Sequence, residues 1–356
     1  MRIGIDTRLA HYRRDGGIAQ YTLRLLDALV RLDGADQFVV LRHRRERLAN
    51  LVAPARHVRA RRLLTPSHHR FEQWTLPVEL SFARLDVLHC PDFIPPFRRR
   101  CPAVITVHDL AFMRYPHLLT PESAAYYGQI ARAVRSAEQI IAVSEATRRD
   151  LVQLVGADER KITVIYEAAD AIYQPITNYQ TIQSVLSKYQ LHQPFLLFVS
   201  TIEPRKNLPM LLRAFRLLLD QCQTNAQLAV AGRPGWLADN VAALADELQL
   251  SEHVKFLGPV PSADLAMLYN ATTMYVMPSL YEGFGLGLVE AMQCGAPVLA
   301  SNVSALPEVA GEAGICLDPN DPTAWADAMR RVLEDEPLRN AMRQKSLRRA
   351  QMFSWD

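Results

Sequence analysis

Two carboxylates flank a glycine-rich turn in the second half of the chain, at Glu282 and Glu290. Glycines at 283, 285 and 287 let a ligand approach the main chain closely. A helix beginning at Leu286 would offer N–H groups and a positive dipole end to a phosphate. Carboxylates accept hydrogen bonds from sugar hydroxyls. The pattern suits an extended, polyhydroxylated ligand, and a glycine-rich helix cap with one surface glutamate is the alternative interpretation.

Arg205 and Lys206 are adjacent cations that follow the first strand-like segment of the second half. Cations at the start of a helix oppose its dipole. The pair is therefore unfavourable unless an anion lies between them, and a diphosphate fits, because Arg binds it as a fork and Lys as a point charge. A solvated pair at a helix start is the alternative.

The first half carries two weaker signals. The turn Asp15-Gly16-Gly17 precedes a predicted helix and could close over the same phosphates, although Gly-Gly turns before helices are common. His108 ends a predicted strand, where an imidazole can donate to a substrate hydroxyl or phosphate. A histidine satisfied by the backbone is an equal alternative at that position.

Apolar strands alternate with amphipathic helices along the whole chain, which predicts an α/β protein with parallel sheets covered by helices on both faces. We expect a first domain over residues 1–172, a linker over 173–193, a second domain over 194–340 and a helical tail over 341–356. Two such domains facing each other would form a central cleft. The predicted strands are Ile3–Ile5, Phe38–Leu41, Val87–Cys90, Val104–Val107, Gln139–Val143 and Ile162–Ile165, then Phe195–Ser200, Gln227–Ala231, Val254–Phe256, Met274–Val276, Pro297–Ala300 and Ile315–Leu317.

Length and composition narrow the class of protein. The 356 residues suggest two domains, and no apolar run reaches the roughly 18 residues of a membrane span. The amino terminus lacks the basic head and long apolar core of a secretion signal. Five scattered cysteines without a CxxC spacing indicate buried thiols in a reducing cytosol rather than disulfides or a zinc site. We therefore expect a cytoplasmic protein without a bound metal.

Charge is uneven along the chain. Residues 1–178 hold 26 basic and 19 acidic residues, a net +7, whereas residues 179–356 hold 14 and 18, a net −4. A solvated basic surface is one interpretation, and an acidic partner, such as anionic lipid headgroups or a phosphorylated acceptor, is the other. Nucleic acid is disfavoured because the clusters have no aromatic residues interleaved with the arginines and no DNA- or RNA-binding motif accompanies them. The excess lies in three arginine clusters, at residues 42–47, 56–62 and 98–100.

Taken together, these motifs resemble the family 4 glycosyltransferases with the GT-B fold, two Rossmann-like doubly wound domains facing a cleft. The resemblance covers nearly the whole chain, and the Glu282-to-Glu290 element with Arg205-Lys206 upstream is its most specific part. The other matching motifs are Gly16-Gly17, His108-Asp109, Val143-Ser144-Glu145, Phe256-Leu257-Gly258, Pro278-Ser279 and Gly295-Ala296-Pro297-Val298.

The resemblance implies a retaining transfer of a sugar from a nucleotide diphosphate sugar to a saccharide or lipid-linked acceptor, with no required metal or other cofactor. Arg205 and Lys206 would neutralise the leaving diphosphate, in the manner of preorganised electrostatic catalysis, and retention would proceed by front-face attack. The resemblance also implies that Glu282 and the backbone of Gly283, Phe284, Gly285 and Leu286 bind the donor sugar and phosphate, and that Glu290 binds the ribose. Gly17 would approach the diphosphate, His108 would contact the donor sugar, and Val260 would line the base pocket.

The sequence departs from the family pattern at three places. Gly287 stands where the family commonly has Pro, and the turn from Tyr166 to Asp170 replaces a more usual Asn-Gly-Val-Asp. Relatives commonly continue from a Phe-Ser-Trp such as Phe353-Ser354-Trp355 into a last helix, so the chain is expected either to be short or to lack its end.

The amino-terminal motif and the segment around Arg205 look like bacterial transferases of polysaccharide assembly, many of which use GDP-mannose. We therefore expect a mannosyltransferase that acts in the cytoplasm or peripherally at the inner face of the membrane, with UDP-glucose and other hexose donors open. A GT-B nucleotide-sugar epimerase and a non-catalytic sugar-nucleotide-binding subunit are the alternatives. A dehydrogenase is disfavoured, because no GxGxxG follows the first strand.

Overall fold

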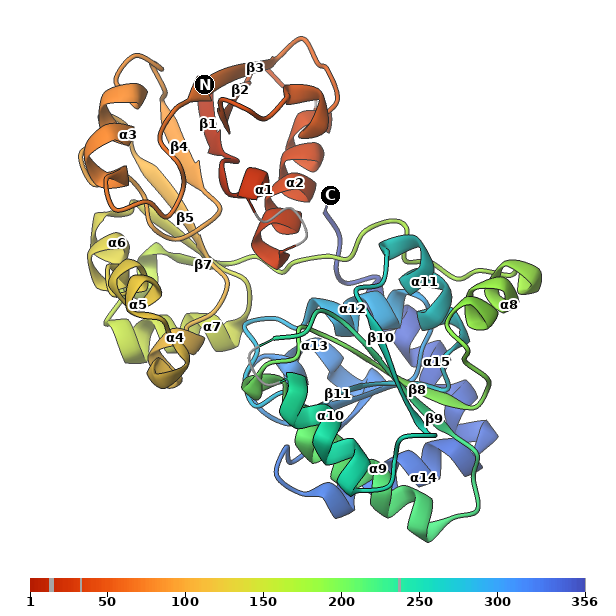
Figure 1. Ribbon diagram of the computed structural model, residues 1–356. Coiled ribbons are helices and arrows are strands. Elements are labelled where there is room, and N and C mark those ends of the chain that lie inside the picture. The colour runs from red at the N-terminus through yellow and green to blue at the C-terminus, as the bar shows by residue number, and fades with distance from the viewer. Residues whose placement is uncertain (13–15, 33, 236–237, 356) are drawn as a thin grey trace. The chain divides into compact units, whose positions relative to one another are not determined.

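A computed structural model of the chain describes residues 1–12, 16–32, 34–235 and 238–355. These residues form two compact units (Figure 1), one of Met1–Glu167 with Trp355 and one of Ala168–Ser354. The division falls a few residues before the boundary predicted at residue 172. Each unit is an α/β layer structure of the predicted class.

The first unit is built on a seven-stranded sheet with the order β3-β2-β1-β4-β5-β6-β7, in which every neighbouring pair is parallel. Ile3 of the first strand pairs with Phe38 on one side and with Val87 on the other. The strands are β1 (Arg2–Asp6), β2 (Gln37–His43), β3 (Val58–Leu63), β4 (Val87–Cys90), β5 (Ala103–Val107), β6 (Gln139–Ala142) and β7 (Ile162–Val164).

Strand β3 was not predicted. Its sequence, VRARRL, contains three arginines in six residues, so the apolar signal of a buried strand is missing. The strand lies at the edge of the sheet and pairs with β2 alone among the described strands. Its two end residues, Val58 and Leu63, are buried, whereas Arg59 and Arg62 are exposed. Arginine is tolerated here because one long edge of the strand faces solvent.

Helices cover both faces of this sheet. On one face Ala19, Leu26 and Val30 of α2 (Gly17–Arg31) pack against Ile5 and Val40. On the other face α3 (Glu72–Leu80) and α6 (Ile130–Ser136) share a core with strands β4 and β5 (Figure 1). The remaining helices of four residues or more are α1 (Leu9–Tyr12), α4 (Ala111–Arg114), α5 (Pro121–Tyr127) and α7 (Glu145–Asp150), the last followed by a π-helical turn at Leu151–Val155.

The second unit has a six-stranded parallel sheet with the order β10-β9-β8-β11-β12-β13. All of its strands were predicted from their apolar runs. Phe198, Phe215 and Trp325 are buried in the core between this sheet and helices α9 and α14. The strands are β8 (Phe195–Val199), β9 (Gln227–Ala231), β10 (Val254–Gly258), β11 (Met274–Met277), β12 (Val298–Ser301) and β13 (Gly314–Leu317), and the helices are α8 (Tyr179–Lys188), α9 (Leu208–Gln221), α10 (Ala238–Glu247), α11 (Ser262–Ala271), α12 (Leu286–Gln293), α13 (Leu306–Ala310), α14 (Pro322–Glu334) and α15 (Glu336–Ala350).

Two segments differ from their predicted status. The predicted linker, residues 173–193, belongs to the second unit and holds α8, which Asp264 of α11 ties down by accepting from Lys188 Nζ at 2.6 Å and from Tyr189 Oη at 2.8 Å. Residues 341–350 of the predicted tail are helical as expected, but they belong to α15, which packs on the second unit through a hydrogen bond from the Ser346 hydroxyl to the Ala296 carbonyl at 2.8 Å. Trp355 groups with the first unit, where its ring lies 5.7 Å from that of Tyr21.

Strand order places the ligand-binding edge in each unit. In open α/β sheets, ligands bind beyond the carboxyl ends of the strands, where the connections on either side run in opposite directions. In the second unit this point lies between β8 and β11, and in the first it lies between β1 and β4. Within the described part of the chain, no helix has the length and apolar character needed to cross a membrane.

Candidate functional site

Arg205, Lys206 and Glu282 come together at the strand-order reversal of the second unit. Lys206 Nζ donates to Glu282 Oε1 at 2.6 Å, and Arg205 Nη1 donates to Glu282 Oε2 at 3.1 Å. The two cations lie in a short 3₁₀ turn, Pro204–Lys206, after β8, and the carboxylate lies in the loop after β11. The family resemblance implied that these three side chains would share a site, and the structure places them in direct contact.

Hydrogen bonds to main-chain carbonyls hold the loop after β8 against the loop after β11. The Arg205 carbonyl accepts from the Leu280 N–H at 2.8 Å. Asn207, whose φ of 59° is left-handed, donates from Nδ2 to the carbonyls of Pro278 at 3.1 Å and Pro319 at 2.7 Å. Asparagine tolerates this backbone region better than most residues. The Pro204–Lys206 turn is thus held in one orientation before α9 begins.

Glu282 is ionised although it is buried. Burial alone would raise the pKa of its carboxyl, but the charges of Lys206 and Arg205 and hydrogen bonds from Lys206 and Ser279 outweigh that effect and lower the pKa to about 2. The Ser279 hydroxyl donates to Glu282 Oε1 at 2.7 Å, and the Glu282 N–H donates to Ser304 Oγ at 2.9 Å. The carboxylate is therefore a fixed negative charge at neutral pH.

The charge that balances the two cations comes from the chain itself. Besides Glu282, Glu203 accepts from Arg205 Nη2 at 2.9 Å. The sequence argument placed an external anion between Arg205 and Lys206, and the structure shows that an internal carboxylate fills that position. An ammonium has three N–H donors and a guanidinium has five, so Lys206 and Arg205 can also share hydrogen bonds with a phosphate.

The turn after Glu282 requires glycine at its last position before α12. Gly285 has a φ of 106° at the cap of α12, and a Cβ there would lie 2.7 Å from Leu306 Cδ2. The Phe284 ring packs on Phe353 with centroids 5.6 Å apart, so the part of Phe284 that a ligand could contact is its main chain. The helix begins at Leu286, as predicted.

Glu290 occupies a separate environment within α12. Tyr269 Oη donates to its Oε2 at 3.0 Å, and burial raises the pKa of its carboxyl to about 7. Its recorded partner is Tyr269 rather than Arg205 or Lys206. The two glutamates of the motif therefore differ in protonation at neutral pH, with Glu282 ionised and Glu290 near half-titration.

Val260 lies at the same edge of the sheet, in the turn between β10 and α11, and its side chain is partly buried. Two strand positions separate β10 from β8. Its predicted contact with a base stays a prediction.

His108 follows β5 in the first unit, and both of its ring nitrogens have partners. Nδ1 lies 2.8 Å from Glu167 Oε1, and Nε2 lies 2.8 Å from the Pro91 carbonyl oxygen. Burial would lower the pKa of His108, but Glu167 and the Pro91 carbonyl raise it above its usual value. Two acceptors favour the doubly protonated ring. A donor-sugar contact would have to replace one of these partners.

The segment Tyr166–Asp170 has a structural role, because its Glu167 carboxylate bonds to the His108 ring.

Gly17, the predicted site residue of the amino-terminal turn, is exposed and is the first residue of α2. A Cβ added to it would meet nothing within 4 Å among the described residues. In the described part of its own unit, nothing requires glycine at that position. Asp15, which precedes this turn, lies outside the described residues.

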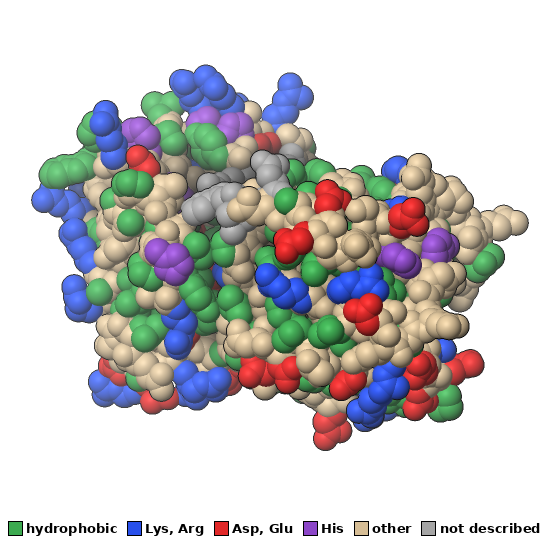
Figure 2. Space-filling model, turned by 60° about the horizontal axis from the view of Figure 1, so that its bottom comes forward, with side chains coloured by type: hydrophobic (Ala, Val, Ile, Leu, Met, Phe, Trp, Pro, Cys, Tyr) green, Lys and Arg blue, Asp and Glu red, His purple; other side chains and the backbone are tan. Residues whose placement is uncertain are grey.

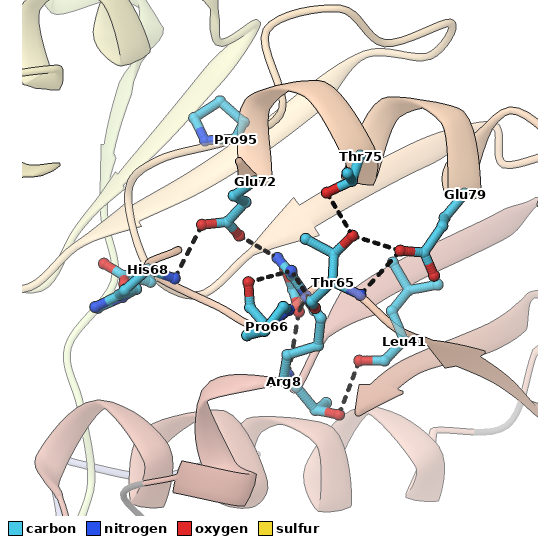
Figure 3. Close-up of polar contacts among 12 residues, drawn as sticks. Arg8, Leu41, Thr65, Pro66, His68, Glu72, Thr75, Glu79 and Pro95 are labelled. Carbon is cyan, nitrogen blue, oxygen red and sulfur yellow. Dashed lines mark hydrogen bonds and ion pairs between the residues drawn. The ribbon is translucent and has the colours of Figure 1, made fainter. Parts of the chain in front are cut away.

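An ionic network that sequence reasoning missed occupies the strand-order reversal of the first unit (Figure 3). Arg8 is 2% exposed and contacts Asp6 Oδ2 at 2.6 Å and Glu72 Oε1 at 2.5 Å. Beside it, His68 Nε2 pairs with Asp92. Asp6 at the end of β1 and the nearby Arg8 were a signal visible in the sequence. Glu72 lies 64 residues from Arg8, so this pairing could not be predicted from spacing.

All five cysteines are free thiols. Cys90 and Cys294 are buried as predicted, whereas Cys101, Cys222 and Cys316 are partly buried. In the described ranges, no three His, Cys, Asp or Glu side chains are grouped in a way that could hold a metal ion.

Comparisons with family models and with known proteins match this chain to glycosyltransferases. The model of "Glycosyltransferase Family 4" matches residues 15–171, and the model of "Glycosyl transferases group 1" matches residues 184–349. The O-antigen chain mannosyltransferase B of Escherichia coli is 35% identical over 84% of this chain and 77% of that protein.

Other relatives are matched over less of their length. A D-inositol 3-phosphate glycosyltransferase of Corynebacterium glutamicum (strain R) is 31% identical over 72% of this chain and 64% of its own length. The serotype-specific mannosyltransferase WbdA of Escherichia coli is 31% identical over 71% of this chain, which spans 32% of that protein.

Solved structures show the same fold. The sucrose-phosphate synthase of Thermosynechococcus elongatus superposes with a TM-score of 0.80 at 21% identity, over 100% of this chain and 95% of the other. Anabaena Alr3699/HepE in complex with UDP-glucose superposes with a TM-score of 0.78 at 20% identity, over 100% and 96%. At these identities the match is one of fold alone.

Proposed function

Since the chain belongs to the family 4 glycosyltransferases, we propose that it transfers a hexose from a nucleotide diphosphate sugar to a hydroxyl of a saccharide or lipid-linked acceptor, with retention at the anomeric carbon and without a metal. The donor that we propose is GDP-mannose, and the setting is bacterial polysaccharide or glycolipid assembly. The O-antigen mannosyltransferase B and WbdA support the choice of mannose by their names.

The observation that carries the proposal is the contact of Arg205 and Lys206 with Glu282 at the strand-order reversal of the second unit. A departing nucleoside diphosphate gains negative charge as the bond to the sugar breaks. Donors that are already oriented and partly desolvated stabilise such charge without reorganisation. Arg205 is held by Glu203 and Glu282, and Lys206 by Glu282, so both are oriented before a ligand arrives.

In the proposed reaction, the bond between the anomeric carbon and the β-phosphate oxygen breaks while the acceptor oxygen bonds to the same face of that carbon. The acceptor proton moves to the departing diphosphate. Arg205 and Lys206 stabilise the diphosphate, the main chain from Gly283 to Leu286 binds donor sugar and phosphate, and Glu290 binds the ribose. Val260, Gly17 and His108 keep their predicted roles toward the base, the diphosphate and the donor sugar.

A nucleotide screen followed by a transfer assay tests the proposal. GDP, UDP, ADP and dTDP are added separately to the purified protein, and the melting temperature is read. A ligand that binds only the folded state raises it by mass action. We expect the largest rise with GDP. Transfer from GDP-mannose to acceptor is then measured with and without EDTA, and the anomeric configuration of the product is read by NMR.

Retention of the α-configuration with undiminished rate in EDTA is the expected result. An inverted product or loss of activity in EDTA would overturn those parts of the proposal. A reaction without acceptor is the control for an epimerase, which would isomerise the donor and release no glycoside. A rise in melting temperature with UDP alone would reassign the donor.

A further inference from the structure

Helix α3 of the first unit has apolar side chains on two faces. Leu76 is 1% exposed and packs in the core beside the buried Glu72, whereas Trp74 and Val78 are 67% and 62% exposed. Surface helices of globular proteins ordinarily carry polar residues on the face away from the core. The helix therefore presents an apolar face that nothing in the described part of its unit covers.

The inward polar contacts of α3 are specific (Figure 3). Glu72 Oε1 accepts from the buried Arg8, and Glu72 Oε2 accepts from the His68 N–H at 2.9 Å. In the last turn of the helix, Glu79 accepts from the N–H groups of Leu64 at 2.6 Å and Thr65 at 2.9 Å. The Glu72–Arg8 ion pair and these main-chain hydrogen bonds fix the rotation of the helix about its axis, and so keep Trp74 and Val78 on the outward face.

The outward residues form one continuous stripe. Phe71, Trp74, Val78 and Phe82 follow one another at intervals of three or four residues, which places them on one side of a helix. Phe71 precedes α3 and Phe82 follows it, and they are 49% and 72% exposed. Large exposed apolar side chains that are contiguous mark interaction sites.

Two of the three arginine clusters border this stripe. Arg61 of β3 donates from Nη2 to the Glu79 carbonyl at 2.9 Å and from Nη1 to the Phe82 carbonyl at 3.1 Å, which places the edge strand beside the end of α3. On the other side, the Arg98 guanidinium lies 5.5 Å from the Trp74 ring centroid. Figure 2 shows basic and hydrophobic side chains interspersed on the part of the surface it displays. Other exposed arginines in these segments are Arg59, Arg70, Arg84 and Arg100. Arg62 is also exposed, but it alternates with Arg61 along β3 and points to the opposite face of the sheet.

The arginines of the third cluster, residues 42–47, have no contact with α3 among those described above. Arg42 is buried, with Nη1 bonded to the Glu46 carbonyl, whereas Arg44, Arg45 and Arg47 are exposed in the turn that follows β2. Within the 98–100 cluster, Arg99 turns inward and pairs with Glu138 at 2.9 Å, whereas Arg98 and Arg100 are exposed. The basic surface that matters here is thus the set around α3 rather than every arginine of the first half.

We propose that this face of the first unit, the α3 stripe with its flanking arginines, docks on the surface of a bilayer that contains anionic lipid. Aromatic and aliphatic side chains on a helix, bordered by basic residues, are the composition that inserts at the headgroup–acyl boundary. Each basic residue near an anionic surface adds about 1 kcal/mol of attraction, which corresponds to about fivefold in binding. Charge complementarity selects this occupant.

A second copy of the chain is disfavoured as the occupant. A two-fold interface brings the same patch of both subunits together, so the arginines of one copy would face those of the other. An anionic lipid surface instead neutralises them.

The test uses full-length protein and sedimentation with two kinds of vesicle, pure phosphatidylcholine and an equal mixture of phosphatidylcholine and phosphatidylglycerol. No donor or acceptor is present, so the result is independent of the proposed transferase activity. We expect binding to the mixed vesicles, little binding to the neutral ones, and loss of binding at about 1 M salt, where the Debye length is about 3 Å.

Two variants and two matched controls assign the surface. The triple variant Trp74→Ser, Val78→Ser, Phe82→Ser should bind mixed vesicles at least about tenfold more weakly. The double variant Arg59→Gln, Arg98→Gln should lose about fivefold per arginine. Tyr179→Ser, which removes a side chain 67% exposed on α8, and Arg331→Gln with Arg348→Gln, which remove exposed charges from the second unit, should bind as the parent does.

Three outcomes would overturn the proposal. They are absence of binding to mixed vesicles at low salt, equal binding by the parent and both α3-face variants, and equal loss of binding in the controls. Sedimentation velocity without vesicles is run in parallel. A dimer that the triple variant converts to monomer, with no vesicle binding by either, would assign the face to a second copy and would also overturn it.

Discussion

At the scale of single residues, the site is a set of fixed charges whose balance depends on every member. Glu282 is ionised because Lys206 and Arg205 stabilise its negative charge. Removal of one partner from a buried pair leaves an uncompensated charge and costs about 3–5 kcal/mol. A variant of this cluster can therefore lose activity through chemistry or through stability, and tests have to separate the two.

We predict that Arg205→Ala and Lys206→Ala each reduce transfer at least about a hundredfold, because the departing diphosphate loses an oriented donor. The measurement is initial rate under saturating donor, together with the melting temperature. Lys206→Arg, which keeps the charge, should retain stability and part of the activity. Arg213→Ala, at an exposed position on α9, is the matched control. Parental turnover in either alanine variant would contradict the assigned role.

Glu290 gives a prediction for pH. Its folded-state pKa is raised to about 7 by burial, so the protonated form is favoured below that pH. If ribose hydroxyls donate to the carboxylate, donor binding requires the ionised form and strengthens as pH rises through 7. With that pKa, the ionised fraction grows about tenfold between about pH 6 and about pH 8, and the affinity for the donor should follow it. Calorimetric titration across this range measures the effect.

The control for this titration is Glu290→Gln, which cannot ionise. It should bind donor more weakly than the parent at high pH and show no change in affinity across the range. A parental affinity that stays constant with pH, or a variant that keeps the same slope, would remove Glu290 from the ribose contact.

Substitution of Gly17 tests whether glycine is needed at this position for stability or for donor binding. A Cβ at this position meets nothing within 4 Å, and alanine is the better helix former by about 1 kcal/mol. Gly17→Ala should therefore leave the melting temperature unchanged or slightly raised, while the KM for the donor rises about tenfold or more because the added methyl obstructs the diphosphate. Unchanged donor kinetics would show that the close approach does not occur there.

At the scale of elements, Gly287 in α12 is explained by Tyr275 in β11. A Cβ at residue 287 would lie 2.5 Å from Tyr275 Oη. The proline common at this position in the family would meet the same hydroxyl. The glycine is thus the partner of a tyrosine rather than a loosened helix start.

This pairing predicts a coupled effect on stability. Gly287→Ala should destabilise the protein by about 1–3 kcal/mol through overpacking, although alanine ordinarily favours a helix. Tyr275→Phe removes the hydroxyl and should recover most of that loss in the double variant. Urea unfolding of the four proteins gives the interaction energy. Additive effects would show that the close contact relaxes without cost.

The elements also show what sequence can and cannot predict. Strands such as β8 and β11 are buried on both faces and are visible as apolar runs, so the sheet of the second unit was predictable. Strand β3 was not, because its arginines hide a strand that uses one edge only. In the site, the motif around Arg205, Lys206 and Glu282 could be predicted from loops that follow neighbouring strands. Glu167 could not, since it reaches His108 from 59 residues away.

At the scale of the whole molecule, the proposed donor site and the proposed lipid-binding face lie in different units. The second unit holds the cluster of Arg205, Lys206 and Glu282, whereas the first holds the α3 stripe with its flanking arginines. A nucleotide and a lipid surface should therefore slow amide hydrogen exchange in different segments of the chain, and hydrogen-exchange measurements can locate both.

With GDP, we expect slower amide exchange in the loops around residues 200–207 and 278–290, because a bound ligand lowers the population of locally open states. Mixed anionic vesicles should slow exchange in the segment around α3 and leave those loops unchanged. The Trp74→Ser, Val78→Ser, Phe82→Ser variant should keep the response to GDP and lose the response to vesicles. If vesicles protect the loop around Glu282, or if GDP protects α3, the two surfaces do not act separately and one of the two assignments is wrong.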